Sequence, residues 1–154
     1  MPNSLSNFLA KATPKAVADV VAAFDRLPED KRAWSPSETS RTAINQLAEV
    51  AILNGSTADT IVNKQFRHDF TMEEYFKELE TLSADWNTLK TLLDANTTKV
   101  VSAILTITDA DLTLVIDSPF GPLTMEQVMS YPYWNACYHE GQINYIASIL
   151  GCLN

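Results

Sequence analysis

The segment Tyr133–Gly151, YWNACYHEGQINYIASILG, places three polar side chains on the apolar face of a predicted amphipathic helix. At about 100° per residue, Asn135, His139 and Gln142 fall within one arc. The apolar residues of that arc are Trp134, Tyr138, Tyr145, Ile146, Ile149 and Leu150. A buried polar group without a partner costs roughly 1–3 kcal/mol, so these groups must be paired. The segment is therefore either a hydrogen-bonded core network or the wall of a site.

The length and charge of the chain limit its class. With 154 residues, 46% of them hydrophobic, the whole chain (1–154) is expected to be one domain with a sizeable core. A net charge of -8 disfavours nucleic acid and anionic lipid as partners. No apolar stretch approaches the roughly 18–20 residues of a membrane span, and no signal-peptide pattern opens the chain. We therefore expect a cytoplasmic protein with no membrane partner.

Apolar spacing and capping signals predict helices in the first part of the chain. A short helix over 4–11 precedes a longer one, which begins with Thr13 as N-cap and Pro14 in the first turn. This longer helix ends at Pro28. The charged segment that follows is predicted to be a loop in which Trp34 covers one end of the helices.

Further signals complete the fold prediction. A helix is predicted over 39–54, with Gly55 as its left-handed cap, and a capping box at Thr71 opens a long helix that continues through Leu93. A β-hairpin is predicted over 112–124, where a second capping box opens the last helix. Four principal helices with this insertion predict an all-α four-helix bundle with a small β-hairpin before the last helix.

Asn135 and His139 have a spacing that suits a metal site. Residues at i and i+4 lie on one helical face, which is how a helix presents two ligands to one ion. One histidine and one asparagine need a stronger third ligand to hold Zn²⁺ or Ni²⁺, because these metals prefer imidazole, thiolate or carboxylate.

Two segments carry a family resemblance. WSPSETSRTAINQLAEVAILNG at 34–55 and WNACYHEGQINYIASILG at 134–151 together resemble the DinB-like (damage-inducible) family of bacterial four-helix bundles, which groups with bacillithiol and mycothiol S-transferases. The resemblance extends over nearly the whole chain in order and spacing. The motifs that support it best are Trp-Ser-Pro before the second helix and His-x-Gly-Gln-Ile in the last helix.

The resemblance implies a homodimer and a metal held by three histidines. Of these positions His139 matches, whereas Asn135 and Glu49 stand at the other two. A Glu, Asn, His set implies either no metal or a divalent ion such as Ni²⁺, Zn²⁺, Mn²⁺ or Fe²⁺, with the harder ions favoured. The residues expected to line a pocket beside it are Gln142, Tyr138, Asn45 and Trp34.

The roles of these residues remain open at the level of sequence. His139 is a core histidine, a metal ligand or an acid–base group. Glu49 belongs either to a solvated stripe with Asn45 and Gln46 or to the cleft. In the second case its pairing with His139 would lower the pKa of the glutamate.

Three functional hypotheses follow, and the sequence does not decide whether the chain is an enzyme. The first is a DinB-like bundle with a degenerate metal site, which binds a small molecule or thiol or serves in a stress response. The alternative is a metal-dependent thiol S-transferase or hydrolase that uses an ion held by His139 and Glu49. A dimerisation module, with Cys137 on the outer face of the last helix, is a third possibility.

Overall fold

The computed structural model describes residues 3–154, which form five α-helices, one 3₁₀ turn and a two-stranded hairpin. The elements are α1 (Ser4–Asp25), η1 (Glu29–Lys31), α2 (Ala43–Asn63), α3 (Met72–Ser83), α4 (Trp86–Ile104), β1 (Val115–Ser118), β2 (Gly121–Thr124) and α5 (Met125–Ile149). The prediction of a mainly helical chain with a hairpin directly before the last helix is confirmed.

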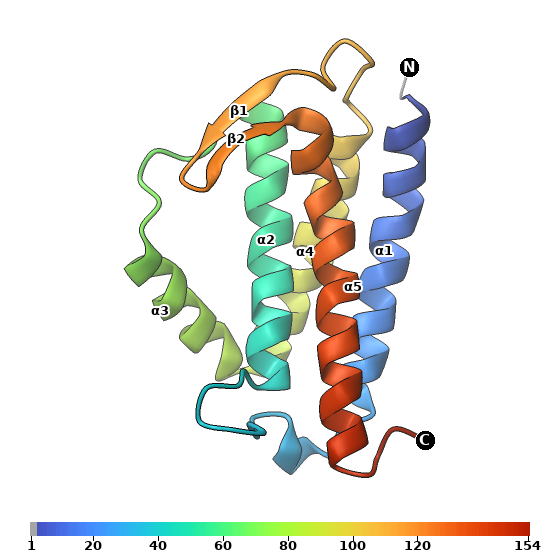
Figure 1. Cartoon of the computed structure of the whole chain (residues 1–154), viewed down its shortest axis with the longest axis vertical. Helices are drawn as coiled ribbons and strands as arrows, with labels where there is room; N and C mark the ends of the chain where they lie inside the picture. The colour runs from blue at the N-terminus through green and yellow to red at the C-terminus, as the bar shows by residue number, and fades with distance from the viewer. Residues whose placement is uncertain (1–2) are drawn as a thin grey trace.

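The four longer helices run side by side along the long axis of the molecule (Figure 1). The main contacts are of α2 with α4 and α5, and of α1 with α5 and α4. The shorter α3 lies outside this group and packs on α2 and α4 (Figure 1). The hairpin lies at one end, beside the upper part of α2 and the start of α5. Helices α2 and α3 and the hairpin, which are separate in sequence, thus lie around the same region of the molecule.

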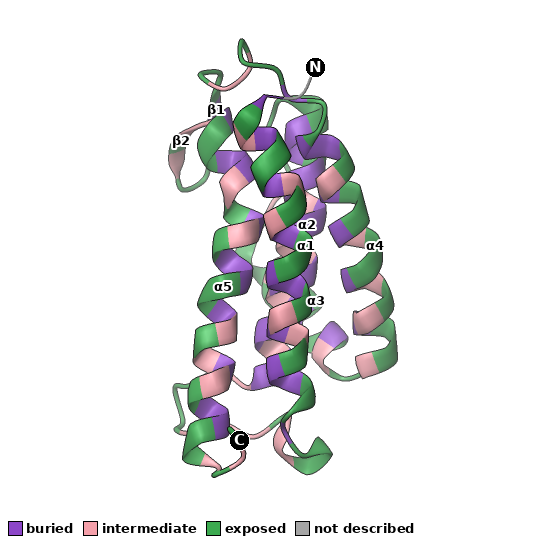
Figure 2. Ribbon diagram, turned by 90° about the vertical axis from the view of Figure 1, so that its right-hand side faces the viewer, coloured by how far each residue is buried: buried purple, intermediate pink, exposed green. Residues whose placement is uncertain are grey.

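Each of the long helices carries buried residues along its length (Figure 2). One cluster surrounds Phe24, Leu47 and Leu89, and a second surrounds Ile61 and Ile104 toward the hairpin end. Burial of each such side chain stabilises the fold by about 1.5–3 kcal/mol. Among residues 3–154, none of the helices combines the length and the apolar character that a bilayer crossing requires.

Helix α1 is continuous, so the prediction of a break at Thr13 is wrong. Its N-cap is Asn3, whose Oδ1 accepts a hydrogen bond from the Ser6 backbone N–H at 2.8 Å. Pro14 lies inside the helix, although it cannot donate a hydrogen bond to the preceding turn. The buried apolar face continues across the proline from Leu9 to Ala16, and this packing outweighs the local signal.

Gly55 is not a helix cap, because α2 continues to Asn63. A Cβ atom at position 55 would lie 2.5 Å from Nδ2 of Asn96 on α4. The same Nδ2 donates a hydrogen bond to the Ala51 carbonyl at 2.8 Å. Gly55 therefore permits the close approach of α2 and α4, and Lys64, with φ of 51°, provides the left-handed cap.

The predicted long helix from Thr71 is two helices, because Asp85 interrupts it. The Asp85 side chain accepts hydrogen bonds from the backbone N–H groups of Asn87 at 3.0 Å and Thr88 at 3.4 Å, which makes it the N-cap of α4. The break lets α3 leave the axis of α4 and place Tyr75 next to α2.

The hairpin is anchored to the core by Ile116, which is buried and pairs with Leu123. Gly121, with φ of 106°, occupies the left-handed region that its turn requires. At the start of α5, the Thr124 backbone N–H donates to Oε1 of Gln127 at 2.9 Å, as the predicted capping box requires. The helix then passes through Pro132 and reaches Ile149 without ending.

Candidate functional site

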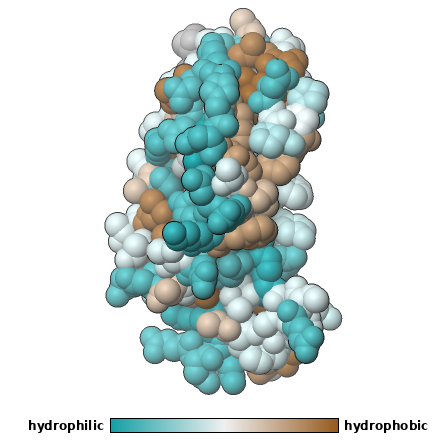
Figure 3. Space-filling view, turned by 90° about the vertical axis from the view of Figure 1, so that its left-hand side faces the viewer, coloured by the Kyte–Doolittle hydropathy of each residue, from teal (hydrophilic) through white to brown (hydrophobic). Residues whose placement is uncertain are grey.

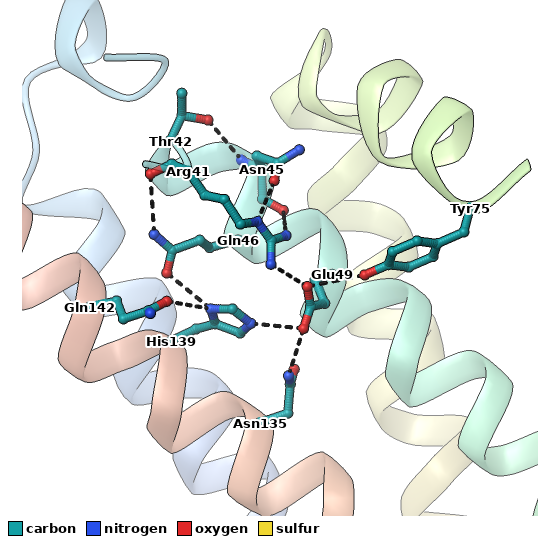
Figure 4. A network of polar contacts seen from close by, with 9 residues as sticks. All are labelled: Arg41, Thr42, Asn45, Gln46, Glu49, Tyr75, Asn135, His139 and Gln142. Atoms are coloured by element: carbon teal, nitrogen blue, oxygen red, sulfur yellow. Dashed lines mark hydrogen bonds and ion pairs between the residues drawn. The ribbon is translucent and has the colours of Figure 1, made fainter. Parts of the chain in front are cut away.

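The three positions of the predicted ligand set come together between α2 and α5 (Figure 4). Nε2 of His139 lies 3.1 Å from Oε1 of Glu49, and Nδ2 of Asn135 donates to the same oxygen at 3.0 Å. Asn135 is 2% exposed and His139 is 1% exposed. Glu49 therefore faces the interior between the two helices and is not part of a solvated stripe.

The second oxygen of Glu49 is also occupied. Nη1 of Arg41 makes an ion pair with Oε2, and the Tyr75 hydroxyl donates to Oε2 at 3.0 Å. The guanidinium is held by Asn45, whose Oδ1 accepts from Nε of Arg41 at 2.7 Å. A carboxylate offers about four acceptor positions. The Glu49 carboxylate therefore has four protein donors and no vacant acceptor position.

The imidazole of His139 is fixed on its other side by two amides. Nδ1 lies 2.9 Å from Oε1 of Gln46 and 3.2 Å from Oε1 of Gln142. Both ring nitrogens thus lie within hydrogen-bond distance of side-chain oxygens, Glu49 on one side of the ring and the two amides on the other. The site then holds one anion, Glu49, between the guanidinium of Arg41 and the imidazole of His139.

The electrostatics follow from these contacts. Burial alone would raise the pKa of Glu49, but the hydrogen bond from His139 and the charge of Arg41 outweigh burial and hold that pKa well below its usual range. Burial, followed by the charge of Glu49, raises the pKa of Tyr75 above its usual value. At neutral pH Glu49 is therefore ionised, and Tyr75 is a neutral hydrogen-bond donor.

The start of α2 builds one half of this network. Thr42 caps the helix through its Oγ1, which accepts from the Asn45 backbone N–H at 3.2 Å. Arg41 directly precedes the cap, and its side chain runs along the first turns past Asn45 to Glu49. The spacing i, i+4, i+8 of these three residues is a sequence signal that could have identified Arg41. Tyr75 comes from α3, and no local pattern pairs it with Glu49.

The other predicted pocket residues divide between two environments. Asn45 and Gln142 belong to the network, as described above. Tyr138 is 50% exposed, although its ring centroid lies 5.2 Å from that of His139. Trp34 is partly buried and packs against the apolar core cluster around Phe24, Leu47 and Leu89.

The aromatic residues of the predicted apolar arc on α5 are not buried. Trp134 is 56% exposed and Tyr145 is 69% exposed, and the ring of Trp134 stacks on that of Tyr138 with centroids 5.4 Å apart. The buried face of α5 is instead centred on Ala136 and Ile143. The aromatic residues therefore form an outer face beside the polar network.

The donor set does not fit the metal that the resemblance implies. Within residues 3–154 no three His, Cys, Asp or Glu side chains gather as a ligand group. The site offers one imidazole, one carboxylate and an amide, and the guanidinium of Arg41 already contacts the carboxylate. A divalent cation there would be repelled by Arg41 and would have to displace the proton on Nε2 of His139.

A cavity of about 430 Å³ adjoins Glu49 and Tyr75. It is bordered by α2, the 64–71 connection, α3, the hairpin and the start of α5. Its aromatic lining residues are Phe66, Phe70, Tyr75, Phe120 and Tyr131. On the face that carries α3, apolar side chains are visible beside the hydrophilic ones (Figure 3). The polar network therefore lies at the edge of a space large enough for a small organic molecule.

Comparison with known proteins identifies the fold only. No protein-family model and no curated protein matches the chain. A crystal structure of an uncharacterised protein from Clostridium difficile 630 is similar, with a TM-score of 0.69 and 13% identity over 97% of this chain and 99% of that chain. Another, of an uncharacterised protein from Escherichia coli UTI89, has a TM-score of 0.68 and 11% identity over 96% of this chain and 95% of that chain.

Proposed function

We propose that this chain is a DinB-like four-helix bundle of the cytoplasm that binds a small molecule and does not use a metal ion. The four bundle helices would be α1, α2, α4 and α5, with α3 and the hairpin enclosing the binding cavity. The Arg41–Glu49–His139 network would take the place of the metal site in the three-histidine members of the family.

The observation that carries this proposal is the saturation of the Glu49 carboxylate. Its two oxygens accept from Asn135, His139, Arg41 and Tyr75, and one of these donors, Arg41, is a cation. In a metal site, the ion compensates the negative charge of a buried carboxylate that has no other counter-charge. Here the protein itself supplies the compensation, so the network is complete without an ion.

Metal content tests the first part of the proposal. The chain is purified without a histidine tag, its bound metals are measured by elemental mass spectrometry, and Mn²⁺, Fe²⁺, Ni²⁺ and Zn²⁺ are titrated calorimetrically. We expect far less than one ion per chain, and no heat that Glu49→Ala or His139→Ala abolishes. Near-stoichiometric metal that both substitutions remove would contradict the proposal and support the metal-dependent thiol S-transferase or hydrolase.

Binding of a neutral apolar probe tests the second part. We expect 1-naphthylmethanol to bind once per chain in calorimetric titration. Leu53→Trp, which enlarges a side chain that lines the cavity, should weaken binding by about tenfold or more. Leu105→Trp makes the same change at an exposed residue at the end of α4, and should leave binding unchanged. No binding to the wild type, or equal loss in both variants, would overturn the proposal.

We also propose that two copies associate through the outer face of α5. The support is the exposure of Trp134, Tyr138 and Tyr145 on one side of this helix. Tyrosine and tryptophan are enriched in protein interfaces. We expect a dimer in size-exclusion chromatography with light scattering, and a monomer for Trp134→Glu. A monomeric wild type would contradict this part alone.

A further inference from the structure

The walls of the cavity beside Glu49 contain a cluster of aromatic rings. The centroid of Phe66 lies 5.6 Å from that of Phe70 and 6.4 Å from that of Phe120, and Phe70 and Phe120 are 6.1 Å apart. Phe120, at the turn of the hairpin, is 71% exposed, so its ring is accessible at the mouth. The faces of aromatic rings carry partial negative charge and attract cations.

The charged residues of the cavity are mostly acidic. Glu49, Glu74 and Glu78 line it together with a single basic residue, Arg67. The Arg67 guanidinium is already paired, with its Nε 3.0 Å from Oδ1 of Asp69 and its Nη2 3.8 Å from Oε2 of Glu74. Within the described chain Glu78 makes no ion pair. The mouth therefore has more negative than positive charge, in a protein whose net charge is -8.

Inside the cavity, Glu49 cannot accept a hydrogen bond from a ligand, because all its acceptor positions are occupied by protein donors. A charged group of a ligand would therefore remain near the mouth, where Glu74 and Glu78 on α3 and the ring of Phe120 are exposed. The apolar part of the ligand would fill the interior, which is lined by side chains such as Leu53 and Leu123. An anionic group would meet repulsion from both carboxylates.

From this arrangement we propose that the cavity selects an organic cation, an ammonium group carried on an apolar body. The inference rests on the proposed binding function of the same cavity and adds the charge class of its ligand. Rings and carboxylates together recognise such a group by cation–π attraction and ion pairing.

Three probes that share a naphthalene ring and are similar in size test the charge class: 1-naphthylmethylammonium, 1-naphthylmethanol and 1-naphthoate, each titrated calorimetrically into the wild-type chain at low salt. We expect the cation to bind about tenfold more tightly than the neutral alcohol, and the anion more weakly than the alcohol. Raising the salt concentration should weaken only the preference for the cation.

Substitutions test which residues produce the preference for the cation. Glu74→Gln and Glu78→Gln should each weaken binding of the cation by about threefold and leave the alcohol unchanged. Glu73→Gln is the matched control, because Glu73 lies on the same helix and does not line the cavity. Phe120→Leu keeps an apolar side chain at an exposed position, so the fold is retained, and should lower the affinity for the cation more than that for the alcohol.

The outcomes separate this inference from the proposed function. Equal binding of cation and alcohol, or tighter binding of the anion, would overturn the charge selectivity while leaving the binding function intact. Loss of cation preference in Glu73→Gln as large as in Glu78→Gln would also overturn it, because the effect would then be one of net charge. Failure of all three probes to bind would overturn the proposed function together with it.

Discussion

Replacing Glu49 by glutamine tests the polar network with little change in shape. Glutamine keeps one acceptor oxygen but places an NH₂ group where two of the four donors now point. One of the two donors, Arg41 or His139, would then lose its acceptor. Hydrogen bonds to charged groups contribute about 1.5–3 kcal/mol each, and breaking a fully buried pair costs about 3–5 kcal/mol. Because the Glu49 side chain is 20% exposed, we expect a loss of about 3 kcal/mol.

The assay is urea unfolding followed by circular dichroism at pH 7, with EDTA present so that no metal contributes. For a chain of this length, a loss of about 3 kcal/mol corresponds to a fall in melting temperature of about 6–12 °C. Glu38→Gln, an exposed position in the loop before α2, is the control for the change in charge. A Glu49→Gln variant as stable as this control, within about 0.5 kcal/mol, would refute the role of the network.

The stabilisation by Glu49 should decrease as the pH falls. The pKa of Glu49 is lower in the folded chain than in the unfolded one. Its contribution to stability is therefore complete above the unfolded value, about 4.3, and is lost as the pH falls through the folded value. The difference in unfolding free energy between the wild type and Glu49→Gln should accordingly narrow below about pH 4. A difference that widened in acid would contradict the direction of the shift.

Three further predictions concern the framework. Gly55→Ala should destabilise the chain by about 1–3 kcal/mol in urea unfolding, because the new methyl group meets a side chain of α4. Gly141→Ala, on the open face of α5, should stabilise it by about 0.5–1 kcal/mol. A loss of stability at both positions would refute the close approach of α2 and α4. Tyr75→Phe removes the bond to Glu49 and should increase hydrogen exchange in α3 without changing it in α4. Asp85→Ala removes the N-cap of α4 and should cost about 1 kcal/mol by the same unfolding assay.

The sequence predicts the helical elements well where local signals and apolar spacing agree. The capping box at Thr124 is confirmed, and Thr71 is the N-cap of α3, although only its side-chain bond to the Glu74 backbone N–H is present. The predicted hairpin is present over the shorter range 115–124. The break at Asp85 was missed because apolar spacing continues across it, although aspartate is a common N-cap. From the sequence alone, Gly55 could be either a helix cap or a position where two helices approach closely. Only the position of α4 distinguishes the two roles.

The site could be predicted in part. The pairing of Glu49 with His139, one of the two arrangements left open by the sequence, is the one that the structure has. The orientation of α5 was not predictable from its own pattern, because Trp134 and Tyr145 look like core residues, whereas the helix buries its smaller residues. Tyr75 joins the network through a helix whose path depends on the break at Asp85. Contacts of this kind depend on tertiary packing and not on spacing.

The most direct test of the account is the ionisation of Glu49 in the metal-free protein. With carboxyl-labelled glutamate, the Glu49 resonance is assigned through Glu49→Gln and followed by carbon NMR in EDTA, to the lowest pH at which circular dichroism shows a folded chain. If the hydrogen bond from His139 and the charge of Arg41 stabilise the carboxylate, Glu49 stays ionised below the usual range, and its pKa rises in Arg41→Gln and in His139→Gln. If a metal ion is the natural partner, the carboxyl of the metal-free protein titrates at or above its usual range and neither substitution changes it, which would contradict the account.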